Sequence, residues 1–211
     1  MISRRPFIKP FGMLQNKKAI LLSGGMDSIA LAYWKRPEVA ITVDYGQRAT
    51  ESEIKAAARV SEILGMEHHV LHIDCSSLGS GDLIGAAPLS VAPISEWWPY
   101  RNQMLVTMAL MKAIQLDVKE LLVGSVKTDA QHADGTAEFY HKLNDLIAMQ
   151  EGGIQISVPA IEMTTVELVK ESKVPENILL YAHSCHISNQ PCGKCHGCMK
   201  YMYVKEQLGI L

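Results

Sequence analysis

Residues 23–28, "SGGMDS", combine glycine with hydroxyl and carboxylate side chains, a composition suited to binding an anion. The stretch follows an apolar run and precedes a run with helical spacing, so its backbone N–H groups can converge beside a helix N-terminus, where phosphate binds. A tight turn would explain the glycines but not both serines. We therefore predict a phosphate site formed by Ser23, Gly24, Gly25, Met26, Asp27 and Ser28. Asp27 could cap the helix or help to place a metal ion.

Four of the five cysteines lie close together near the C-terminus, in residues 185–198. Four thiolates complete a tetrahedral structural zinc site, and clustered cysteines in a cytoplasmic chain indicate metal more often than disulfides. The predicted Zn²⁺ ligands are Cys185, Cys192, Cys195 and Cys198. Because four thiolates leave no open position, we expect the metal to stabilise the fold and to take no part in the chemistry.

Other residues near these cysteines leave alternatives open. The neighbouring histidines that could replace a cysteine as ligand are His183, His186 and His196. An iron–sulfur cluster is an alternative occupant. Lys194 and Lys200 would offset part of the negative charge of the thiolates.

Alternating strands and helices are expected to position both groups. Short apolar or β-branched runs predict buried parallel strands at 19–23, 39–46, 68–74, 120–126 and 154–160. Helical spacing predicts helices at 27–34, 50–64, 102–116 and 138–149. This alternation predicts an α/β fold with a doubly wound, Rossmann-like parallel sheet that binds ligands beyond the carboxyl ends of its strands. The irregular stretch 76–99 is a candidate lid, and Trp97 and Trp98 belong either to the core or to a docking surface.

Composition limits the possible partners. The chain has 211 residues, is 48% hydrophobic and carries a net charge of −2. Without a basic excess we expect no stable binding to nucleic acid, and without a long apolar run we expect no membrane partner. The sequence predicts a cytoplasmic protein with an N-terminal arm (1–18), a nucleotide-binding domain (19–174) and a helical zinc-binding segment (175–211).

The loop at 23–28 resembles the pyrophosphate-binding loop of the N-type ATP pyrophosphatases, the PP-loop superfamily. These enzymes cleave ATP between its α and β phosphates and attach AMP to a substrate oxygen. Further matching motifs are "VDYGQR" at 43–48, "PYRN" at 99–102, "VGSVKTD" at 123–129 and "CHISNQPCGKCHGC" at 185–198. Their order and spacing are similar to the 7-cyano-7-deazaguanine synthase family, QueC, from residue 18 to about 203.

This resemblance implies a reaction and its cofactors. QueC enzymes activate the carboxylate of 7-carboxy-7-deazaguanine with ATP, let ammonia displace AMP, and activate the resulting amide with a second ATP to leave a nitrile. The implied cofactors are ATP, Mg²⁺ and structural Zn²⁺, and the implied assembly is a homodimer. Activation is needed because a carboxylate is a poor electrophile whose leaving group would be oxide, and adenylation supplies a good leaving group.

The resemblance also assigns residues. Asp44 and Asn102 are expected at the nucleotide, and Arg101 is expected to contact a phosphate, although a surface ion pair or a helix cap would also suit this arginine and asparagine. On the substrate-facing rim are expected Tyr45, Gln47 and Arg48. Arg48 could alternatively be a solvated charge at a helix start. The residues expected to be catalytic are Ser23, Asp27, Arg101 and Asp129.

The loop expected to hold the deazaguanine departs from the family pattern. A guanine-like ring needs a carboxylate that accepts from its ring N–H and amine, and the resemblance places Thr128, Asp129 and Asp134 there. The chain reads "KTDAQHADGT", without the Ser-Gly-Tyr-Pro segment and Cys-Arg pair of the family. Asp129 could instead cap the following turn. Near Thr165 a lysine typical of the family is also missing.

These departures leave the acceptor open. One hypothesis is the biosynthetic reaction with ammonia. Another is a QueC-like enzyme of an antiviral or phage system that conjugates the activated deazaguanine to a protein amine, such as an N-terminus. Two further hypotheses are a zinc interaction module on a degenerate nucleotide-binding scaffold and an enzyme that thiolates or amidates a tRNA base. The intact phosphate loop disfavours the former, and the mild acidity disfavours the latter.

Overall fold

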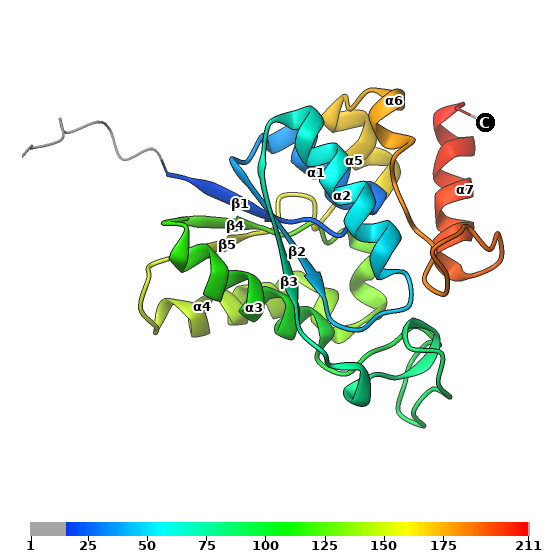
Figure 1. The fold of residues 1–211 in the computed structure, drawn as a ribbon, viewed down its shortest axis with the longest axis horizontal. Helices are drawn as coiled ribbons and strands as arrows, with labels where there is room; N and C mark the ends of the chain where they lie inside the picture. Colours follow the sequence, from blue (N-terminus) through cyan, green and yellow to red (C-terminus); the bar gives the residue numbers. More distant parts are fainter. Residues whose placement is uncertain (1–15, 211) are drawn as a thin grey trace, which may run out of the picture.

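Five parallel strands form one sheet in the order β3-β2-β1-β4-β5 in the computed structural model, which describes residues 16–210 (Figure 1). The strands are β1 (Lys18–Leu21), β2 (Val39–Asp44), β3 (Glu67–His72), β4 (Glu120–Leu122) and β5 (Gln155–Ser157). All four strand pairs are parallel, which confirms the predicted doubly wound α/β sheet. The predicted arm at 1–18 lies outside the described residues, except for 16–18.

Seven α-helices surround the sheet in the described part of the chain. They are α1 (Met26–Lys35), α2 (Thr50–Leu64), α3 (Arg101–Gln115), α4 (Ala137–Ala148), α5 (Thr165–Ser172), α6 (Glu176–Leu179) and α7 (His196–Leu208). Local sequence explains several ends. Thr164 and Glu167 form a capping box at the start of α5, and Gly65, at φ 71°, ends α2. None of the described helices is long and apolar enough to cross a membrane.

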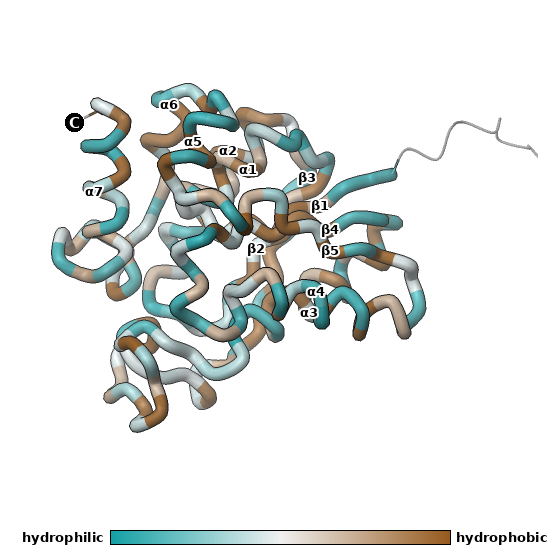
Figure 2. Tube along the Cα trace, turned by 180° about the vertical axis from the view of Figure 1, so that it is seen from behind, coloured by the Kyte–Doolittle hydropathy of each residue, from teal (hydrophilic) through white to brown (hydrophobic). Residues whose placement is uncertain are grey.

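Alternation along the central strands divides the core into two layers. Ala19 and Leu121 face a cluster with α3 and α4, whereas Ile20 and Leu122 face a cluster with α1, α2 and α5. Figure 1 shows these two helix groups on opposite faces of the sheet, and Figure 2 shows β2 as a mostly hydrophobic segment between them. Full burial of a leucine or isoleucine side chain contributes roughly 1.5–3 kcal/mol, so the two clusters hold the strands and helices in fixed positions.

The order in which the chain adds strands to the sheet reverses between β1 and β4. From β1 it winds outward through β2 to β3, then crosses back to β4 and continues to β5 on the other side. Connections on the two sides of such a point leave a crevice at the carboxyl ends of the strands. The loop 23–25 follows β1 at this point, and residues 123–126 follow β4.

Some predicted elements differ from the structure. The strand predicted at 120–126 ends as β4 at Leu122, although the Val123 N–H still donates to the Ser157 carbonyl at 2.9 Å. In the candidate lid 76–99, short 3₁₀ turns at 76–78 and 81–83 interrupt irregular chain. Trp98 is 2% exposed and packs edge-on against Tyr45, with ring centroids 4.9 Å apart, so it belongs to the core and not to a docking surface.

Candidate active site and metal centre

The loop after β1 has the geometry of an anion site. Gly24 has φ 80°, and a Cβ there would lie 2.6 Å from the Glu53 carbonyl oxygen of α2, so only glycine fits. Gly25 is the N-cap of α1 and forms no side-chain cap, which leaves the start of the helix open to a ligand. The Ser23 and Ser28 hydroxyls lie 3.2 Å apart beside it.

A cavity of about 280 Å³ lies at the carboxyl ends of β1 and β4. Its wall contains nine residues that the sequence predicts for the site: Ser23, Gly25, Met26, Asp27, Ser28, Tyr45, Arg101, Asn102 and Asp129. The apolar part of the wall includes Leu21, Val43, Leu83 and Leu105. An anion loop beside an apolar wall is suited to a ligand with both phosphate groups and flat rings.

Six predicted residues do not line the cavity: Gly24, Asp44, Gln47, Arg48, Thr128 and Asp134. Gly24 instead packs against α2. Asp44 accepts from the Gly46 N–H and pairs with His72 at 3.0 Å. Partial burial acts to raise the pKa of Asp44, but these hydrogen bonds outweigh it and the pKa is lowered. Arg48 and Thr128 are exposed.

Gln47 has a structural role that the sequence did not indicate. Its side chain is buried, accepts from the Tyr45 N–H at 2.9 Å and donates to Glu53 at 2.7 Å. Gln47 therefore braces the turn after β2 and does not face a substrate. Burial raises the pKa of Glu53, and the hydrogen bond from Gln47 opposes this shift.

Asp134 likewise belongs to the framework of the site. Its Oδ2 atom accepts from the Asn102 N–H at 3.0 Å, and its carbonyl accepts from the Asn102 side chain at 2.9 Å. Asp134 thus satisfies the start of α3, where backbone N–H groups lack helical partners. Asn102 does not cap α3 itself, because the N-cap residue is Tyr100.

Three charged side chains meet at the polar end of the cavity. The Lys200 Nζ atom, from α7, lies 2.9 Å from Asp27 Oδ2 and 3.7 Å from Asp129 Oδ1. Asp129 Oδ2 also accepts from the Val126 N–H at 3.0 Å, so the turn cap considered from sequence is present as well. Burial raises the pKa of Asp129, and the nearby Lys200 ammonium opposes this. Lys200 faces these carboxylates, so the role expected for it at the thiolates is corrected.

Two buried oxygens of the cavity wall have no hydrogen-bond partner among residues 16–210: Asp27 Oδ1 and Thr165 Oγ1. A buried polar atom without a partner is costly, so such atoms indicate a ligand. A carboxylate oxygen beside a phosphate loop fits a hard divalent cation. Thr165 stands where the family lysine was expected.

The aromatic and cationic part of the cavity wall is supplied by the end of one strand and the start of one helix. Tyr45 is buried after β2, and burial raises its pKa to about 12 while the Arg101 charge opposes the shift. Arg101 is the first residue of α3 and lines the cavity, and its contact with a phosphate stays a prediction. Tyr45 is therefore a neutral hydrogen-bonding phenol at physiological pH.

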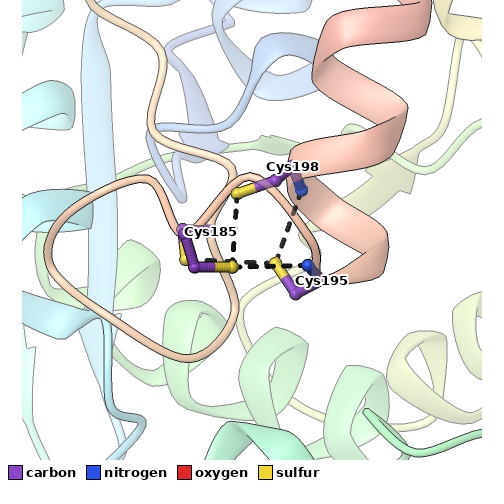
Figure 3. Close-up of side chains that lie close together, drawn as sticks. Cys185, Cys195 and Cys198 are labelled. Atoms are coloured by element: carbon purple, nitrogen blue, oxygen red, sulfur yellow. Dashed lines mark hydrogen bonds between the residues drawn. The ribbon is translucent and has the colours of Figure 1, made fainter.

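The four C-terminal cysteines converge as predicted. Their sulfur atoms all lie within 4.8 Å of one another, with Cys192 and Cys198 at 3.8 Å and Cys185 and Cys195 at 3.9 Å. Ligands at the Zn–S distance of a tetrahedral site lie about 3.8 Å apart. Figure 3 shows Cys198 projecting from α7 toward Cys185 and Cys195. The residues fit a metal ion, and none of the three alternative histidines belongs to the group within the described chain.

Backbone N–H groups support these sulfur atoms. Cys192 Sγ accepts from the Lys194 and Cys195 N–H groups at 3.5 and 3.3 Å, and Cys195 Sγ accepts from the His186 and Cys198 N–H groups at 3.4 and 3.5 Å. Such bonds stabilise thiolates, the form that binds metal.

Comparison with known proteins identifies the family. The family model described as "Queuosine biosynthesis protein QueC" matches residues 17–203. The chain belongs to the QueC family. It is 30% identical over 220 residues to the 7-cyano-7-deazaguanine synthase of Methanosarcina barkeri, covering 92% of this chain and 95% of that protein. It is also 30% identical over 213 residues to that of Methanocaldococcus jannaschii, covering 87% and 92%.

Two solved structures share the overall fold of this QueC member. The U34-tRNA thiolase NcsA from Methanococcus maripaludis, solved with its [4Fe-4S] cluster, aligns with a TM-score of 0.52 at 18% identity, covering 92% of this chain and 65% of the thiolase. The NMN synthetase from Francisella tularensis aligns with a TM-score of 0.50 at 17% identity, covering 92% and 77%. These likenesses concern the fold alone.

Proposed function

We propose that this QueC member converts 7-carboxy-7-deazaguanine, ATP and ammonia into 7-cyano-7-deazaguanine. The observation that carries the proposal is one cavity that joins the phosphate loop, the Asp27, Lys200 and Asp129 group, and an apolar wall. The match to QueC over residues 17–203 supports the deazaguanine as substrate.

In the first step a substrate carboxylate oxygen attacks the α-phosphorus of ATP, and pyrophosphate leaves. The N–H groups of the loop and the hydroxyls of Ser23 and Ser28 would bind the leaving pyrophosphate. Arg101 and Lys200 would lower the charge repulsion between the carboxylate and the triphosphate. The product is an acyl adenylate, whose AMP is a good leaving group.

Neutral ammonia then attacks the carbonyl carbon, AMP departs with one carboxylate oxygen, and a proton is released to leave an amide. The amide oxygen attacks the α-phosphorus of a second ATP, and pyrophosphate leaves again. Loss of the second AMP, with the remaining oxygen, and of the last nitrogen-bound protons gives the nitrile. Both adenylation steps need the same groups around the α-phosphorus of ATP, so one cavity can serve both steps.

We assign Mg²⁺ and Zn²⁺ to separate places. Asp27, with its unpartnered Oδ1 atom, would hold Mg²⁺ at the phosphates, where this ion neutralises charge on the leaving pyrophosphate. The four cysteines would hold Zn²⁺ as a structural ion. Asp129 remains our candidate for the deazaguanine ring, because Asp134 is engaged at α3.

Mass spectrometry of a reaction with ATP, Mg²⁺, 7-carboxy-7-deazaguanine and ammonia tests the proposal. The zinc-loaded protein should form the nitrile, and Asp27→Asn should slow AMP formation at least a hundredfold, on the order of the loss of one transition-state contact. Asp145→Asn is the matched control, because Asp145 is exposed on α4 and lies off the cavity. Equal rates in both variants, or a deazaguanine adduct on protein without nitrile, would contradict it.

A further inference from the structure

Helix α7 belongs to both centres. The Cys195 sulfur caps its first turn by accepting from the Cys198 N–H at 3.5 Å, and Cys198 is itself part of the helix. Lys200 follows two residues later and reaches Asp27 at 2.9 Å. A helix rises about 1.5 Å per residue, so Cys198 and Lys200 are about 3 Å apart along the axis. A metal ion that fixes Cys198 therefore fixes the base of the Lys200 side chain.

Lys200 occupies a partly enclosed position between two carboxylates. The side chains of Lys200 and Asp27 are 28% and 19% exposed, and Asp129 Oδ1 lies 3.7 Å away on the other side. The Lys200 amine thus lies within ion-pair distance of both carboxylates. Without this ammonium, two carboxylates at the phosphate site would repel each other and an incoming polyphosphate.

The cysteine segment contacts the chain around the cavity at three further points, and of the residues involved only His183 lines the cavity itself. The His183 N–H, just before Cys185, donates to the Gly24 carbonyl at 2.9 Å. His196, the first residue of α7, hydrogen-bonds Glu96 in the segment 76–99. Between Cys185 and Cys192, Asn189 accepts from the Ser52 N–H and hydroxyl at the start of α2. The segment that holds the metal thus also touches the phosphate loop.

We propose that occupancy of the four-cysteine site and of the nucleotide cavity are thermodynamically linked, and that Lys200 is the positioning residue that carries most of this linkage. The inference rests on the proposed function only in that the cavity binds ATP. In the metal-free protein the start of α7 loses its anchor, Lys200 leaves the carboxylates, and nucleotide binding weakens. Linkage is reciprocal, so nucleotide must strengthen metal binding by the same factor.

Calorimetric titration with a non-hydrolysable ATP analogue and Mg²⁺ tests this with the full chain, with and without Zn²⁺. The wild-type affinity should fall at least fivefold when Zn²⁺ is removed, within the range typical of coupled sites. In Lys200→Met the affinity for the analogue should be low both with and without Zn²⁺, so that removal of Zn²⁺ changes it by less than about twofold. Lys200→Arg keeps the charge and should keep the zinc effect.

Lys194→Met is the matched control, because Lys194 is also basic and near the sulfurs but is exposed and lies off the cavity. It should retain the wild-type zinc effect. The thiolate absorption bands of Co²⁺ report metal loading independently of activity, so each variant can be checked for an intact four-cysteine site. The same bands measure Co²⁺ affinity with and without the analogue, which gives the reciprocal factor if the metal-free protein does not stay folded.

The outcomes separate the two proposals. No binding of the analogue to zinc-loaded wild-type protein would contradict the proposed function. Binding that is equally strong with and without Zn²⁺ would overturn the linkage and leave the function intact. A zinc effect of wild-type size in metal-loaded Lys200→Met would overturn the role of Lys200.

Discussion

Gly24→Ala should destabilise the protein far more than Gly25→Ala, although the two glycines are adjacent in the phosphate loop. Gly24 has φ 80°, and an added Cβ would lie 2.6 Å from the Glu53 carbonyl oxygen and 2.9 Å from the Ala56 Cβ atom of α2. Gly25 has φ −80°, and its added Cβ would meet only the Ser23 hydroxyl at 3.6 Å and the His183 carbonyl at 3.8 Å. Those are ordinary contacts.

The size of the effect follows from this geometry. The left-handed backbone costs an L-residue roughly 1–2 kcal/mol, and forcing a methyl group into packed atoms costs roughly 1–3 kcal/mol. Alanine also lowers the conformational entropy of the unfolded chain, which offsets roughly 0.4–1 kcal/mol of this loss of stability. We expect Gly24→Ala to lower the free energy of unfolding by about 2–4 kcal/mol, and Gly25→Ala, which only changes an N-cap, by less than about 1 kcal/mol.

Urea denaturation of the zinc-loaded proteins measures both values, with unchanged slopes showing that the same surface is exposed on unfolding. Gly24→Ala should also weaken binding of the ATP analogue, because the loop must move away from α2 to admit the methyl group. Equal losses of stability in the two variants would refute the close approach of the loop to α2.

Three further predictions concern other parts of the site. Asp134→Ala removes the acceptor at the start of α3 and should lower the free energy of unfolding by about 1 kcal/mol in urea; no loss would contradict the capping role. Burial raises the pKa of Tyr45 and Tyr140 to about 12, so the folded chain keeps protons that the unfolded chain loses near pH 10. Stability should therefore fall as pH rises from 10 to 12, less steeply in Tyr140→Phe, and ultraviolet titration that shows all tyrosines ionising together would contradict this. Cys192→Ser should weaken Co²⁺ loading while Cys75→Ser leaves it unchanged; equal loading would contradict a four-cysteine site.

Much of the fold could be predicted because the local signals were strong. Short apolar strands ending in turn-formers gave the sheet, and all four predicted helices begin and end within about two residues of the observed ones. The loop at 23–28 could be placed because it follows the first predicted strand and precedes the first predicted helix, and the structure puts it where the strand order reverses. The spacing of the four cysteines was sufficient to predict their convergence.

Two errors, at Lys200 and Asp134, arose where a role depends on contacts distant in sequence, whereas the error at Gln47 concerns the direction of a side chain with local contacts. Lys200 meets Asp27 across 173 positions, and only the docking of α7 brings them together. Asp134 accepts a hydrogen bond from Asn102 of α3, 32 positions earlier. This contact depends on the fold of the loop that departs from the family pattern. Gln47 follows a strand, as rim residues do, yet its amide turns inward to satisfy the backbone of the turn. Sequence pattern indicates the edge of a sheet on which a residue lies but not the direction of its side chain.

In the proposed reaction, transfer of AMP to an oxygen of the substrate carboxylate activates this carboxylate. Isotope labelling tests this most directly, with ¹⁸O in both carboxylate oxygens of 7-carboxy-7-deazaguanine and mass analysis of all products after the reaction with ATP, Mg²⁺ and ammonia. Two AMP molecules should form per nitrile, each with one ¹⁸O atom, and pyrophosphate should carry none. Label in phosphate or pyrophosphate, or a nitrile formed with unlabelled AMP, would contradict it.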